Sequence, residues 1–117
     1  MTQTNPEKLG QLGRLRTEFL GLLFPKSALT GYRRNVIQQI LPNLVSIANN
    51  SKFHPAARVN AITTIGLLDE AVGSSSVPPT PSTAAYNALR QMFTANDSET
   101  FVKVEALSGI RRFAELS

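Results

Sequence analysis

Two stretches of the chain share one pattern, and this repeat constrains the fold more than any other feature. Residues 55–68 read PAARVNAITTIGLL, and residues 100–113 read TFVKVEALSGIRRF. Shifting the sequence by 45 positions brings apolar residues onto apolar residues: Val59 onto Val104, Ala61 onto Ala106, Ile62 onto Leu107 and Ile65 onto Ile110. Periods of about 40–47 residues that hold two helices each are typical of α-solenoids. The repeat therefore predicts a helical hairpin that occurs twice.

Apolar residues recur at helical spacing over almost the whole chain, whereas the alternation that is typical of strands is nowhere sustained. The pattern predicts an all-α fold with about five helices in a single domain that covers residues 1–117. The expected helices cover residues 6–24, 28–49, 55–71, 82–95 and 98–116. Serines and prolines dominate the segment between the third and fourth helices, so a loop is expected at residues 72–82.

The composition fits a globular protein, since 42% of the 117 residues are apolar and 17% are charged. The chain has no cysteine and one histidine, which argues against a disulfide framework and against a transition-metal site. No run approaches the roughly 20 apolar residues of a membrane span. We therefore expect no cofactor, no metal and no membrane contact, and the cytoplasm is the expected compartment.

Residues 40–68 resemble a HEAT repeat. In that family a proline lies inside the first helix, an aspartate lies in the turn, and a Val/Ala–Arg step opens the second helix. Pro42 matches the first element and ARVNA (57–61) the third, while the second copy has Asp97 in its turn and Lys103 six residues later. The resemblance covers about residues 30–117, and residues 15–23 weakly resemble the second helix of an earlier repeat. It implies an α-α superhelix of HEAT-like hairpins, in which the Asp97 and Lys103 positions hold turns and repeats in register. A plain helical bundle is the alternative.

Residues that often carry chemistry have simpler structural interpretations in this chain. His54 precedes Pro55 at an expected helix start, where a capping or solvent-facing role is favoured over catalysis. Asp69 and Glu70 are adjacent, and adjacent helical residues do not face each other, so a solvated helix end is expected. GSSS (73–76) lacks the lysine and the strand–turn–helix context of a phosphate loop or nucleophile motif. The sequence thus favours a protein that is not an enzyme.

Arginines form two doublets, Arg33–Arg34 and Arg111–Arg112, and two more lie at Arg14 and Arg16. Solvated helix faces are the favoured interpretation, and a basic ridge that contacts phosphates is the alternative. The formal net charge of +4 is modest, and no aromatic residue is interleaved with the arginines as a stacking platform for bases.

The resemblance also implies where a partner binds, because the second helix of each HEAT pair lines the inner surface. Two neighbouring rows of contact residues are therefore expected: Asn60, Thr63, Thr64 and Leu67 on one helix, and Glu105, Ser108, Gly109 and Arg112 on the other. The expected function is that of a non-catalytic scaffold for protein–protein interaction, and the alternative is a weak nucleic-acid-binding module that uses surface arginines. The expected partner is another protein, with neighbouring repeats of a longer chain or self-association through the last helix as further options.

Overall fold

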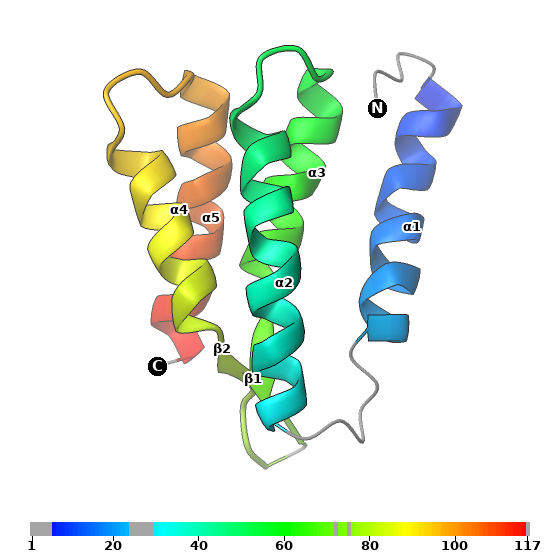
Figure 1. Ribbon diagram of the computed structural model, residues 1–117, viewed down its shortest axis with the longest axis vertical. Helices are drawn as coiled ribbons and strands as arrows, with labels where there is room; N and C mark the ends of the chain where they lie inside the picture. Colours follow the sequence, from blue (N-terminus) through cyan, green and yellow to red (C-terminus); the bar gives the residue numbers. More distant parts are fainter. Residues whose placement is uncertain (1–5, 24–29, 72, 75, 117) are drawn as a thin grey trace.

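The computed structural model describes residues 6–23, 30–71, 73–74 and 76–116. Within them the all-α class is confirmed, because helices make up most of the chain. Two short strands join the third helix to the fourth (Figure 1). In chain order the elements are α1 (Pro6–Leu23), α2 (Thr30–Asn49), α3 (Pro55–Gly66), β1 (Asp69–Ala71), β2 (Thr80–Pro81), α4 (Thr83–Thr94) and α5 (Thr100–Leu116).

The helices form two antiparallel hairpins that lie side by side. α2 packs on α3 and α4 packs on α5, while extensive contact between α3 and α5 joins the two hairpins. In Figure 1, α1, α3 and α5 run downward and α2 and α4 run upward. α1 lies along α3, on the side away from α5. The second helices of the two hairpins therefore pack in parallel, and α1 continues their layer.

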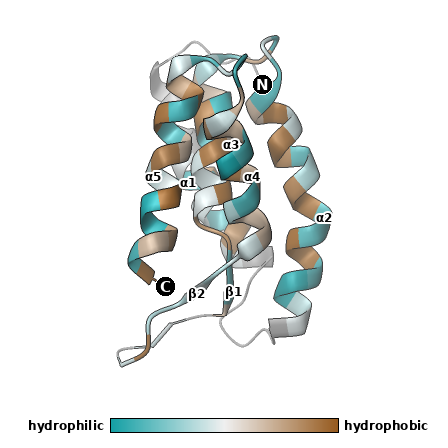
Figure 2. Cartoon of the chain, turned by 90° about the vertical axis from the view of Figure 1, so that its left-hand side faces the viewer, coloured by the Kyte–Doolittle hydropathy of each residue, from teal (hydrophilic) through white to brown (hydrophobic). Residues whose placement is uncertain are grey.

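The hydrophobic core lies between the helices, and the apolar stripes predicted from the sequence supply it. Figure 2 shows hydrophobic residues recurring along each helix between hydrophilic ones. The largest fully buried side chains come from α2, α3, α4, α5 and the residue pair that follows α3: Ile37, Ile62, Ile65, Leu68, Leu89 and Val102. Ala61 and Ala106, which the repeat superimposes, are also part of this core.

The expected helix over residues 55–71 is wrong at its end, because α3 stops at Gly66 and residues Asp69–Ala71 form β1. β1 pairs in antiparallel fashion with β2, so part of the segment expected as a loop is a small two-stranded sheet. The reason is that the backbone here finds partners outside the helix. The carbonyl oxygen of Leu68 accepts a hydrogen bond from the N–H of Ser82 at 2.9 Å, and its side chain is buried. The expected helix limits at residues 24 and 28 lie outside the described residues.

Polar side chains mark the starts of α3 and α4. Nδ1 of His54 accepts a hydrogen bond from the N–H of Ala56 at 3.0 Å, which confirms the capping role expected for this histidine. Oγ of Ser82 accepts in the same way from the N–H of Ala85 at 3.2 Å. Both contacts satisfy N–H groups that have no partner within the first helical turn.

Two glycines allow α3 and α5 to approach closely. A Cβ atom at Gly109 would lie 2.6 Å from Cδ1 of Leu89 and 3.3 Å from Cα of Gly66. A Cβ at Gly66 would lie 3.2 Å from Cα of Gly109. A side chain at either position would need the facing backbone or the Leu89 side chain to shift, so the close contact between the hairpins depends on the two glycines.

We predict that Gly109→Ala destabilises the protein, because its methyl group overlaps the buried Leu89 side chain. Overpacking costs about 1–3 kcal/mol, and the better helix propensity of alanine offsets about 1 kcal/mol, so a net loss of up to about 2 kcal/mol is expected. Gly21→Ala is the matched control, since a Cβ there meets no atom within 4 Å. It should raise stability by up to about 1 kcal/mol in urea unfolding. Equal effects of the two substitutions would contradict the close contact.

Candidate functional site

A groove of about 170 Å³ runs between α3 and α5, and most of the expected contact residues line it. Its walls are mostly apolar, with Ile62 and Gly66 contributing to them. The two predicted rows meet here, as expected from their places on neighbouring helices, and six of their members are lining residues: Thr63, Leu67, Glu105, Ser108, Gly109 and Arg112.

The side chains along this groove differ in their exposure to solvent and in whether their polar groups already have partners. Leu67 follows the last turn of α3 and is exposed, so it presents an apolar surface to solvent. Ser108 is exposed on α5, and Glu105 is half-buried beside it. The hydroxyl of Thr63 donates to the carbonyl oxygen of Val59 at 3.0 Å, so its donor is already used within α3. The groove therefore offers apolar contact, with Glu105 and Ser108 as polar groups at its edge.

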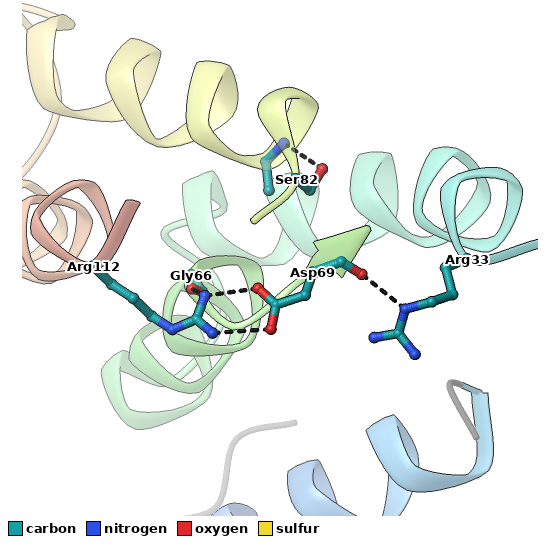
Figure 3. A network of polar contacts seen from close by, with 6 residues as sticks. Arg33, Gly66, Asp69, Ser82 and Arg112 are labelled. Atoms are coloured by element: carbon teal, nitrogen blue, oxygen red, sulfur yellow. Dashed lines mark hydrogen bonds and ion pairs between the residues drawn. The ribbon is translucent and has the colours of Figure 1, made fainter. Parts of the chain in front are cut away.

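Arg112 holds one end of the groove in place. Its Nη1 and Nη2 donate to Oδ1 and Oδ2 of Asp69, each at 2.9 Å, and Nη1 also donates to the carbonyl oxygen of Gly66 at 3.2 Å (Figure 3). A bidentate arginine–carboxylate pair of this kind fixes both position and orientation. The solvated helix end expected for Asp69 is therefore wrong, since this residue is half-buried in β1.

β1 is also tied to α2 by the first arginine doublet. Nε of Arg33 donates to the carbonyl oxygen of Asp69 at 3.1 Å, and the Arg33 residue is only 7% exposed (Figure 3). Arg34 forms a looser ion pair with Glu70 at 3.4 Å. The expectation that both doublets lie on solvated faces is thus wrong for Arg33 and Arg112. Their guanidinium groups are directed inward because β1 supplies the acceptors.

Asn60 and Thr64 do not line this groove, so the structure does not bring them together with the other expected contact residues. Oδ1 of Asn60 accepts a hydrogen bond from Nη1 of Arg16 in α1 at 2.6 Å. Thr64 is buried, and its hydroxyl donates to the carbonyl oxygen of Asn60 at 2.7 Å. Both residues line a second, apolar hollow of about 330 Å³ beside α1, to which Leu15 and Phe19 contribute. This side of α3 faces α1.

A third arginine joins the turns of the two hairpins at the opposite end of α3. Nε of Arg58 donates to the carbonyl oxygen of Ala48 at 2.9 Å, and Nη1 forms an ion pair with Oε1 of Glu99 at 2.9 Å. The guanidinium also lies over the ring of Phe101, 4.9 Å from its centroid. Sequence reasoning attached the joining of the turns to the Asp97 and Lys103 positions, and it missed the pair of Arg58 with Glu99. The sequence did contain an indication of this role, because Arg58 is the arginine of the ARVNA stretch (57–61) that matches the opening of the second helix in a HEAT repeat.

In comparisons with known proteins, no family model, curated protein or solved structure was found to match this chain. The resemblance to HEAT repeats therefore stays a prediction. Within the residues that the structure describes, no three His, Cys, Asp or Glu side chains gather in a way that could hold a metal ion. In the same part of the chain, none of the helices combines the length and the apolar character of a membrane crossing.

We predict strong coupling between Asp69 and Arg112 in a double-mutant cycle with alanine. Because the pair is bidentate and largely shielded from solvent, a coupling energy of about 1–2 kcal/mol is expected from thermal or urea unfolding. Glu70 and Arg34 provide the matched control from the same strand. The Arg34 side chain is 58% exposed, so this second cycle should give less than about 0.5 kcal/mol. Similar values in both cycles would show that the Arg112 contact adds little to stability.

Proposed function

We propose that this protein is a non-catalytic module for protein–protein interaction, built from HEAT-like hairpins, and that the groove between α3 and α5 is its contact surface. One observation carries the proposal. Six residues expected on a partner-binding face, from two segments far apart in the sequence, line one groove. The proposed partner is another protein, and the cytoplasm is the proposed compartment.

The size and lining of the groove favour a protein partner over a small ligand or cofactor. Pockets for small molecules usually have volumes of about 300–1,000 Å³, and this groove, at about 170 Å³, holds one or two side chains. Protein interfaces commonly combine a small apolar centre with a polar rim. Leu67 and Gly109 match such a centre, while Glu105 and Ser108 match the rim.

The alternative function, binding of nucleic acid through arginines, has less support. Arg33, Arg58 and Arg112 each bond to groups within the protein, and Arg16 bonds to Asn60. A guanidinium that is already bound contributes little to the neutralisation of phosphates on which such binding depends. The exposed arginines among the described residues lie on four different helices: Arg14, Arg34, Arg90 and Arg111.

We predict that Ser108→Arg abolishes partner binding, because the long side chain fills the groove from an exposed helical position. The measurement is affinity capture with the intact protein, followed by identification of what is retained. Asn87→Arg is the matched control, since it adds the same charge at an exposed position of α4, away from the groove. A specific partner is one that binds the unmodified protein and the Asn87→Arg variant but not Ser108→Arg.

Leu67→Glu provides a second test of the same groove from the α3 side. A charge at this exposed position should weaken capture of the same partner at least tenfold, with little change in the melting temperature. If both groove variants retain every protein that the unmodified chain retains, the groove is not the contact surface and the proposal fails.

We further predict no submicromolar binding to duplex DNA or single-stranded RNA at about 150 mM salt in fluorescence anisotropy. Each phosphate contact contributes a slope in log affinity against log salt of about −0.9 on duplex DNA and about −0.7 on a single strand, so a few scattered arginines bind measurably only at low salt. The informative variant is Arg111→Ala, because Arg112 also pairs with Asp69 and its removal would lower stability as well. Submicromolar binding that Arg111→Ala weakens would favour the nucleic-acid function instead.

A further inference from the structure

We infer that the outer face of the α4–α5 hairpin is a docking surface for a helical hairpin of another protein. This face is defined by Phe93, Lys103, Val104 and Leu107. The inference does not depend on the groove between α3 and α5. It comes from the repeat within the chain, since the corresponding face of the α2–α3 hairpin is covered by α4 and α5.

Apolar residues on the outer face are more exposed than their counterparts in the first hairpin. Phe93 is 40% exposed, whereas Ala48, at the same position of the repeat, is fully buried. Val104 is 57% exposed, whereas Val59 is half-buried. Leu107 is half-buried, whereas Ile62 is 1% exposed. The second hairpin thus has the apolar surface that packs against a neighbour in the first, and this surface reaches solvent.

The charge on the outer face indicates the chemistry of the docked hairpin. Lys103 stands at the position of Arg58, and Arg58 pairs with Glu99, the residue that precedes α5 in the neighbouring hairpin. A hairpin docked in the same register would bring a carboxylate before its second helix close to Lys103. The predicted occupant therefore has an apolar helical face and an acidic residue at that turn.

A second copy of this chain fits the outer face less well. Stacked in the same register, a copy would present Lys52 and His54 where the second hairpin has Asp97 and Glu99, so no carboxylate would face Lys103. The copy's own α1 also lies along the α3 side that would have to dock. Both the charge and the position of α1 favour a different polypeptide as the occupant.

Arg111 restricts where a docked helix can come closest. It occupies the position of Gly66, which allows the tight contact between α3 and α5. The side chain at Arg111 is exposed and would hold a neighbouring helix away from that part of α5. The closest approach is therefore expected near Val104 and Leu107, one to two turns earlier.

The test supplies a hairpin to the outer face by appending a second copy of this chain's own α4–α5 hairpin. The full chain is extended after Ser117 by a flexible Gly/Ser linker of about 15 residues and a second copy of residues 79–117, which includes α4, Glu99 and α5. The linker gives an effective concentration on the order of millimolar, so weak docking becomes visible. We expect one cooperative transition, more helix by circular dichroism, and a melting temperature at least about 5 °C above that of the original chain.

Val104→Asp in the receiving chain should remove this rise, yet change the melting temperature of the unextended protein by less than about 2 °C, since Val104 is already exposed. Gln91→Asp is the matched control, because it places aspartate on an exposed position of α4 outside this face.

A charge swap tests the ion pair. Changing Glu99 to Lys in the appended copy should lower the rise in melting temperature, and Lys103→Glu in the receiving chain should restore it. Leu67→Glu, which alters the other groove, should leave the rise unchanged, so the two proposals can fail separately.

Three outcomes would overturn the inference. Either the appended hairpin adds no stability, or the rise persists in the Val104→Asp variant, and the outer face then does not dock a hairpin. If instead sedimentation shows that the unextended chain dimerises at micromolar concentration and that Val104→Asp makes it monomeric, the face serves a second copy and not a different partner.

Discussion

The close packing of α3 on α5 at Gly66 and Gly109 is the contact on which the rest of the structure depends. A helical hairpin buries only part of its apolar surface, so it needs a neighbour that covers the remainder. At the two glycines nothing but backbone separates the hairpins, and side chains such as Leu89 then fill the space beside them. The position of the helices, and with it the shape of the groove, follows from this approach.

Arginines fix the hairpins on both sides of that contact. Arg58 joins the end of α2 to the turn before α5, and Arg112 joins α5 to β1. Each guanidinium bonds to a carboxylate and to a backbone carbonyl, which removes the cost of burying an unpaired charge. These two of the chain's 12 lysines and arginines therefore set the register between helices, and they contribute less to any binding of phosphates.

The two proposed surfaces have one physical origin. The repeat gives each hairpin a side that packs against a neighbouring hairpin, and it puts the two rows of residues on neighbouring helices. Between α3 and α5 these rows meet and form the groove, while on α5 the side for a neighbour carries Val104 and Leu107 next to Lys103. One surface would receive side chains of a partner and the other a whole hairpin, so a protein of this size would be able to contact two partners at once.

Local patterns in the sequence were enough to predict the all-α class, the helix start at Pro55, the start of α4 to within one residue, and the contribution of Ala61 and Ala106 to the core. These features depend on helical periodicity and on capping, which act within a few residues. The repeat also placed Thr63, Leu67, Glu105 and Ser108 on rows that meet in one groove.

The remaining features depend on contacts between segments far apart in the chain. The end of α3 at Gly66 and the formation of β1 require Ser82 and Arg33 as partners, and no periodicity of residues 67–71 reveals them. Asn60 and Thr64 lie beside α1 and outside the groove, because α1 packs on that side of α3. Likewise, the Arg112 side chain points inward and forms an ion pair because tertiary packing brings Asp69 within 2.9 Å of it. The local sequence pattern around a residue does not specify which distant residues pack against it.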